Sequence, residues 1–319
     1  MQAHNPLTPT LDSDEYRQLV GRPAGARPSD EATFLAELEQ AQSLRPQDTN
    51  LLIRATDELR LLDRRGNQPG TVAIMSQHIA CLDRLYTASI DPLTKGSLAS
   101  TFADASAIAG WAALDRSWIR NSLEHFSTAI FAAQYAEDRL LSAFASAQRA
   151  YVFIDLGQFA SAQKVVANVI QTDGRSVPND LAAWLYGTQA ETAAANGDAD
   201  LCKRSLDLGR KRLAQAGSSG ECAYVVLNEL HFERWAGSCL AKLGDREAID
   251  SLETVRSELH PDFARALGGV LVDLTQAYVA QGELDAASNT FTSAVLLTSE
   301  VGSIRQLNRL RTLRHSWPK

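Results

Sequence analysis

The sequence has few cysteines, and none of them is spaced as a metal-binding or redox pair. The four cysteines stand at positions 81, 202, 222 and 239. A chain of 319 residues with 45 % hydrophobic side chains can build its core without disulfides. Isolated cysteines in such a chain are typical of reduced, buried thiols. This pattern predicts a cytoplasmic protein with no disulfide framework.

Long apolar runs are also missing. No stretch approaches the roughly 18 consecutive apolar residues that are needed to span a bilayer. The opening "MQAHNPLTPTLDSDEY" lacks the basic segment followed by an apolar one that marks a secretory signal. We therefore expect no membrane-spanning helix and no secretion signal.

Positive charge is in deficit, since the formal net charge is −7. An acidic chain is poorly suited to a long nucleic-acid-binding surface. Known catalytic and nucleotide-binding motifs are absent too, because the sequence contains no GxSxG, HExxH, Walker or GxGxxG pattern. We therefore predict no catalytic residue, no cofactor and no sequence-specific DNA binding.

Histidines and acids do not cluster as metal ligands do. The six histidines are never closer than 29 residues in sequence, and "HFE" at 231–233 is the nearest approach to a ligand group. Residues two apart on a helix point in nearly opposite directions, so His231 and Glu233 cannot share a metal. The acids at 57–58, 198 and 200 fit helix surfaces or helix starts. No metal site is predicted.

Helical patterns fill most of the remaining sequence. Residues 1–28 carry four of the ten prolines and predict a flexible arm. A first helix is predicted to begin after Ser29, which is a candidate N-cap. Alanine- and leucine-rich helical patterns follow, and no alternating strand pattern interrupts them. The chain is predicted to be all-α.

Glycines recur at the ends of these helical patterns, 38 to 47 residues apart. "DLGQF", "ANGDA", "KLGDR" and "AQGEL" place them at positions 157, 197, 244 and 282. Each glycine suits the left-handed residue that ends a helix, and the short turn after it sends the next helix back antiparallel. A period near 40 residues predicts stacked helical hairpins.

In the second helix of each predicted hairpin, core positions recur at helical spacing, and the first of them holds a small residue. Ala162 and Ala287 are two such residues, and small side chains there let two helices approach closely. The predicted hairpins lie at about 48–90, 92–136, 138–172, 178–216, 219–259 and 261–299, before a closing helix at 302–315. Together they predict one right-handed superhelical solenoid domain over residues 29–319.

The turn pattern Leu-Gly-x-(Phe/Leu)-x-x-Ala resembles the tetratricopeptide repeat, with units somewhat longer than that family's usual 34 residues. "LASTFADASAIAGWAALD" (98–115), the glycine turns and "VGSIRQLNRLRTLR" (301–314) resemble the sensor region of actinobacterial helix-turn-helix transcriptional regulators. Those regulators carry a DNA-binding domain before the repeats, where this chain has the 1–28 arm.

The resemblance implies a non-catalytic regulatory protein that holds a peptide, a small molecule or a protein partner in a concave groove. An enzyme of specialised metabolism that uses the same groove as an active site is the alternative. Direct DNA binding through the basic C-terminal helix is a weaker third hypothesis, because a single helix has no domain to position it.

The first helix of each hairpin lines the concave face of such a solenoid. Counting back from the small positions places a set of aromatic and polar residues there: Phe144, Tyr151, Trp184, Glu191, His231, Arg234 and Gln276. Aromatic rings with a few polar groups suit a peptide or an amphipathic small molecule. The same aromatics also fit as core between neighbouring hairpins, and this interpretation stays open.

The closing helix carries the strongest charge pattern. Residues 303–319 contain no acid and five cations: Arg305, Arg309, Arg311, Arg314 and Lys319. An apolar row lies beside them at helical spacing: Ile304, Leu307, Leu310 and Leu313. We predict that this row docks on the 261–299 hairpin and caps the solenoid. The arginines would then lie on the outer sides, where they suit the helix dipole or contact an acidic partner, including a second subunit.

Overall fold

The computed structural model describes residues 31–66, 69–174, 176–217, 222 and 224–317. This part of the chain is all-α and contains no strand, as predicted. The predicted arm 1–28, the candidate cap Ser29 and the C-terminal Lys319 lie outside the described residues.

The described helices pack mainly against their neighbours in sequence. They are α2 (Glu31–Gln42), α3 (Pro46–Arg65), α4 (Pro69–Ala88), α5 (Pro92–Asp115), α6 (Ile119–Tyr135), α7 (Arg139–Asp155), α8 (Phe159–Thr172), α9 (Asn179–Ala195), α10 (Ala199–Leu213), α11 (Glu229–Leu243), α12 (Glu247–Glu258), the 3₁₀ helix η1 (Pro261–Phe263), α13 (Ala264–Gln281), α14 (Leu284–Glu300) and α15 (Ile304–Ser316). The predicted hairpins coincide with the pairs α3–α4, α5–α6, α7–α8, α9–α10, α11–α12 and α13–α14.

The glycine turns lie where the spacing predicts them. Gly157, Gly197, Gly244 and Gly282 each stand between the two helices of a pair, with φ between 70° and 76°. A side chain with a Cβ rarely adopts this left-handed conformation, so glycine is the favoured residue there. The turns that reverse these four pairs are therefore encoded locally.

Short polar side chains begin many of the helices. The carboxylates of Asp91, Asp138 and Asp198 accept hydrogen bonds from backbone N–H groups three residues later, and the Asn228 side chain does the same. These caps satisfy donors that a helix N-terminus otherwise leaves unpaired. The acid at 198 thus serves a helix start, as its sequence position indicated.

Helices cross closely at the predicted small positions. Ala162 and Ala287 are completely buried. Ser122, a small residue of α6, donates a hydrogen bond of 2.8 Å to the Gly110 carbonyl of α5. The structure confirms that these positions lie in helix–helix contacts.

We expect Ala162→Leu or Ala287→Leu to lower the free energy of unfolding by about 1–3 kcal/mol, because each added side chain would overpack a filled contact. Denaturant unfolding of the purified variants measures the loss. Ala216→Leu is a matched control, because this alanine lies after α10 and is only half-buried. If the buried variants unfold like the control, the crossing contacts are looser than described.

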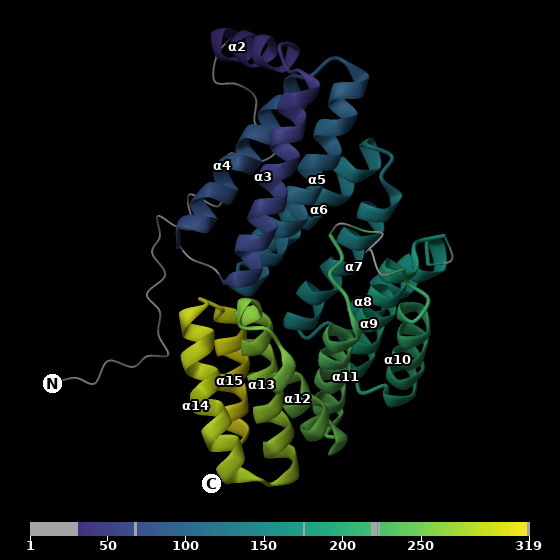
Figure 1. Ribbon diagram of the computed structural model, residues 1–319, viewed down its shortest axis with the longest axis vertical. Coiled ribbons are helices and arrows are strands. Elements are labelled where there is room, and N and C mark those ends of the chain that lie inside the picture. Colours follow the sequence, from purple (N-terminus) through teal and green to yellow (C-terminus); the bar gives the residue numbers. More distant parts are fainter. Residues whose placement is uncertain (1–30, 67–68, 175, 218–221, 223, 318–319) are drawn as a thin grey trace, which may run out of the picture.

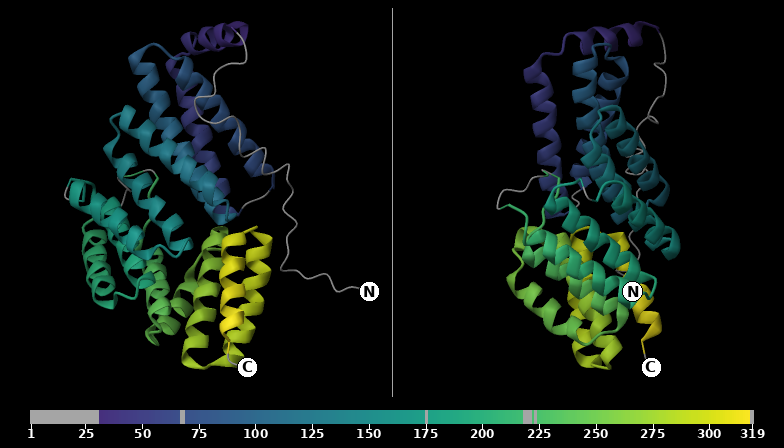
Figure 2. Two further views of the ribbon diagram at one scale, coloured as in Figure 1. Left: turned by 180° about the vertical axis from the view of Figure 1, so that it is seen from behind. Right: turned by 90° about the vertical axis from the view of Figure 1, so that its right-hand side faces the viewer.

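The last helices of the described chain return to the early helices α3 and α5. Figure 1 shows α3 to α6 at the top, α7 to α10 on the right, and α13 to α15 at the lower left, below the ends of α3 and α5. The view from behind agrees (Figure 2). Contacts of α13 with α3 and of α15 with α5 join these regions. The helix pairs thus curve around an inner side that the last helices help to close.

Candidate functional site

The inner side is lined by one face of each of α7, α9, α11 and α13. Helical spacing explains why the same face recurs: Trp184 and Glu191 are seven residues apart on α9, as are Trp235 and Lys242 on α11. Seven residues make about two turns, so both members of each pair project from the same side. Contacts between α7 and α9, α9 and α11, and α11 and α13 place these faces next to one another.

Aromatic rings connect the first part of this face. The Phe144 ring centroid lies 4.6 Å from that of Trp184 and 4.9 Å from that of Tyr224, and Trp184 lies 5.8 Å from Trp235. Phe144 and Tyr151 are buried, whereas Trp184 is half-buried. Phe144 and Tyr151 therefore serve as core between helix pairs, as the second interpretation of the sequence held. Trp184 packs against the core but retains some exposed surface.

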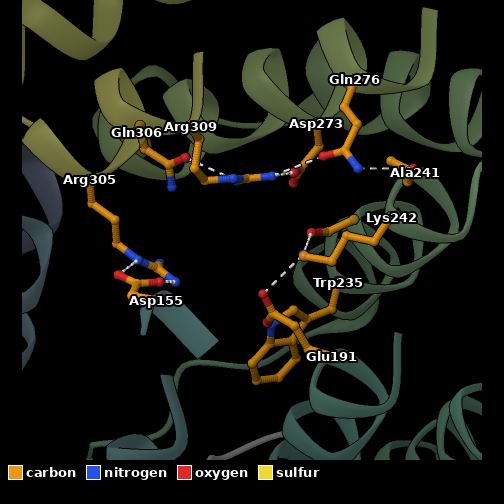
Figure 3. A network of polar contacts seen from close by, with 11 residues as sticks. Asp155, Glu191, Trp235, Ala241, Lys242, Asp273, Gln276, Arg305, Gln306 and Arg309 are labelled. Atoms are coloured by element: carbon orange, nitrogen blue, oxygen red, sulfur yellow. Dashed lines mark hydrogen bonds and ion pairs between the residues drawn. The ribbon is translucent and has the colours of Figure 1, made fainter. Parts of the chain in front are cut away.

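Glu191 is the centre of a polar network, which is drawn in Figure 3. Its carboxylate accepts hydrogen bonds from Trp235 Nε1 at 2.9 Å and from Lys242 Nζ at 3.1 Å. Lys242 also donates to Ser238 Oγ at 2.8 Å. Burial raises the pKa of Glu191, but Lys242 and Arg305 outweigh it, so that the pKa lies below its usual value. Glu191 is consequently ionised at neutral pH.

A second part of the network joins α13 to the closing helix. Arg309 Nη2 donates to Asp273 Oδ1 at 2.6 Å, and Gln276 Nε2 donates to the Ala241 carbonyl at 3.3 Å. Burial raises the pKa of Asp273, but the charges of Arg309 and Lys242 outweigh it, so that the pKa lies below its usual value. Figure 3 shows Arg309 reaching both Asp273 and Gln276, to whose side-chain oxygen it donates at 3.4 Å.

The side chain of Arg305 does not lie where the sequence analysis predicts it. Its guanidinium forms two hydrogen bonds with Asp155 on α7, at 2.7 and 2.8 Å, and its carbon lies 5.7 Å from the ring centroid of Trp111. Arg309 also turns inward, to Asp273. The prediction that these two arginines lie on the outer sides of the helix is wrong. α15 contacts α5 as well as α13 and α14, and this face of the helix meets the acids Asp155 and Asp273.

The remaining features of the closing helix follow the prediction more closely. Leu307 and Leu310 are buried, and Leu310 packs in one cluster with residues of α13 and α14. Arg311 donates to Asn308 within the helix at 2.7 Å, and Arg314 is exposed beside Trp317. The apolar docking of the cap is confirmed, and the two C-terminal arginines remain candidates for partner contact.

His231 and Arg234 lie in the N-terminal half of α11, at the other end of the helix from Lys242. The His231 ring lies 4.8 Å from that of Phe263, while Glu233 points elsewhere and pairs with Arg210 at 2.9 Å. The structure thus separates His231 from Glu233, as the helical spacing predicts. Within the described residues no group of three or more histidines, cysteines or acids could hold a metal ion.

Two histidines are expected to make stability fall in mild acid. Burial lowers the pKa of both His125 and His231 to about 4, and Arg234 and Arg64 lower that of His231 further. The unfolded chain binds protons at these residues below about pH 6.5, whereas the folded chain does so only near pH 4. The free energy of unfolding should therefore fall as the pH is lowered from about 6.5 to about 4. The loss is at most about 1.4 kcal/mol per pH unit for each histidine.

Urea unfolding at several pH values tests this dependence. A variant with His125→Gln and His231→Gln should show a flatter profile between pH 6.5 and 4, because glutamine does not titrate. We expect His125 to contribute the smaller part of the pH dependence, because its side chain keeps some contact with solvent. Parallel profiles for the variant and the native chain would contradict the assignment.

The network suits recognition better than proton transfer. Glu191 and Asp273 have lowered pKa values and Arg305 has a raised one. Groups held in fixed charge states at neutral pH make poor general acids or bases but persistent electrostatic partners. Burial, followed by the charge of Glu191, raises the pKa of Tyr151 as well, so this phenol stays protonated.

Several members of the network were missed by sequence reasoning. Lys242 could have been found from its spacing of seven residues after Trp235, and Asp273 from its position one turn before Gln276. Asp155 has no such signal, because its partner Arg305 lies 150 residues away in sequence.

The described helices include none that is both long enough and apolar enough to cross a membrane. No protein-family model matches the chain. No curated protein matches it significantly either.

Proposed function

We propose that this chain is a non-catalytic binding protein with a regulatory role, which holds a peptide, a small molecule or a protein partner on its inner side. In this proposal the helix pairs form a right-handed superhelical solenoid of the tetratricopeptide-like class. Contacts between the first helices of successive pairs support it, since solenoid repeats stack on their neighbours in this way. The likeness to the sensor region of transcriptional regulators supports the regulatory role.

One observation carries the binding proposal: the inner side holds half-buried Trp184 next to an ionised network of Glu191, Lys242 and Arg309. An aromatic surface beside fixed charges can hold an apolar group and orient a polar one. A ligand with a carboxylate would compete with Asp273 for Arg309.

Native mass spectrometry of the full chain, incubated with defined peptide and metabolite pools, tests the proposal. We expect a bound mass with the native chain and its loss in a variant with Glu191→Gln and Lys242→Gln, which removes an inner ion pair without changing net charge. The matched control, Arg246→Gln with Glu283→Gln, removes an exposed pair and should retain the ligand. The proposal fails if no pool yields a bound mass, or if both variants bind alike.

A further inference from the structure

A polar groove of about 620 Å³ lies between α6, α7 and α8. It is separate from the inner side. Ser142, Ser146 and Arg149 of α7 line it, whereas Phe144 and Tyr151 of the same helix face inward. At 3.6 residues per turn these two sets project from roughly opposite sides of the helix. The groove therefore belongs to the outer surface.

The groove holds two cations that lack acidic partners. Among the described residues neither Arg149 nor Lys164 forms an ion pair, and Arg149 Nε is buried without a hydrogen-bond partner. Asp173 is the one acid in the lining, and Arg139 pairs with it at 3.0 Å. A buried donor without a partner is uncommon in folded proteins, because its desolvation is not offset. The groove thus presents uncompensated positive charge.

The rest of the lining defines what accompanies that charge. Ser161 and Asn168 offer exposed hydrogen-bonding groups on α8. Half-buried Val165 and the buried Ala143 and Val169 form the apolar part of the lining. The volume falls within the roughly 300–1,000 Å³ of small-molecule sites. Serine hydroxyls and an amide beside an arginine and a lysine form a donor set for an oxyanion.

We propose that this outer groove binds a small organic oxyanion, a phosphate monoester or a carboxylate, that also carries an apolar group. Arg149 and Lys164 neutralise the oxyanion, the hydroxyls of Ser142 and Ser146 bond its oxygens, and the apolar group rests on Val165. The site is independent of the ligand proposed for the inner side.

Isothermal titration calorimetry with the full chain tests the groove. The probes are phenyl phosphate and phthalate, which share an aromatic ring and differ in the oxyanion, with benzyl alcohol as the neutral analogue. We expect one saturable site for at least one of the anions and none for the alcohol. A variant with Arg149→Gln and Lys164→Gln should bind that anion about tenfold more weakly or worse, as expected when charged hydrogen-bond donors are lost.

A charge-matched control separates the groove from the net charge of the chain. Lys203→Gln with Arg204→Gln removes two exposed cations from α10 and should bind as the native chain does. Lys164→Gln alone guards against misfolding of the double variant, since Lys164 is exposed; it should melt like the native chain and bind less tightly. The proposal is overturned if neither anion binds the native chain, if the control loses as much affinity as the groove variant, or if a hexaglutamate peptide binds where both small anions fail.

Discussion

Replacing Arg265 with methionine is expected to lower the free energy of unfolding by about 3–5 kcal/mol, the range seen when one partner of a buried charge cluster is removed. Arg265 Nη1 donates to Asp63 Oδ2 at 2.8 Å, and its Nε lies 3.4 Å from Asp115 Oδ2. All three side chains are almost fully shielded from solvent. Methionine keeps most of the volume but leaves two carboxylates without their cation.

The protonation of Asp63 supports this expectation. Burial raises the pKa of Asp63, and the charge of Arg265 opposes that rise. Without Arg265 the carboxyl group must either stay charged in a buried place or take up a proton, and both destabilise the folded chain at neutral pH. Adding Asp63→Asn and Asp115→Asn to Arg265→Met should therefore restore part of the lost stability.

Urea unfolding of the single, the triple and a control variant measures these effects. Arg139→Met is the control, because it breaks the pair with Asp173 in which the arginine is largely exposed; we expect a loss of about 0–1 kcal/mol. If Arg265→Met and Arg139→Met lose the same stability, the cluster between α3, α5 and α13 contributes no more than a surface pair.

The local features of the fold could be predicted from the sequence. The helices and the glycine turns are local features, because a left-handed glycine and a capping aspartate act within one turn of chain. Two other turns could not be predicted in this way, because their left-handed residues are not glycines: Ser117 and Glu137 adopt φ of 60° and 56°. They reverse the chain after α5 and after α6 where no residue signal marks the turn.

The long-range pairs could not be predicted for a different reason. Arg265 lies 202 residues from Asp63, and Ser303 lies 188 residues from the Asp115 carboxylate that it contacts. Helical periodicity states which face of a helix is buried, but not which distant helix covers it. No single sequence motif indicates that α13 and α15 return to α3 and α5.

The same limit explains the error at the closing helix. The spacing of Leu307 and Leu310 correctly predicts a buried face, and one would then assign the arginines to solvent. Arg305 and Arg309 instead meet acids of α7 and α13, which sequence order alone does not bring near α15. The direction in which the arginines of a closing helix point thus depends on the acids of the helices that it packs against.

Reversing the charge of Arg309 is consequently expected to damage the fold, by about 3–5 kcal/mol. Arg309→Glu would place a second carboxylate against Asp273, whose own side chain is almost fully buried. Arg311→Glu with Arg314→Glu changes the same helix by twice as much charge. Arg314 is exposed, and Arg311 donates its hydrogen bond to Asn308 of the same helix, so we expect a loss of only about 0–1 kcal/mol from the double variant.

Thermal and urea unfolding of both variants, together with their sedimentation at low and high salt, separate the two roles of the helix. A docking role predicts that Arg309→Glu alone unfolds early and loosens α15. A partner-binding role for the outer arginines predicts that the Arg311 and Arg314 variant keeps its stability but loses any salt-sensitive self-association of the native chain, because screening weakens exposed charge contacts. Equal stability of the two variants would contradict the inward placement of Arg309.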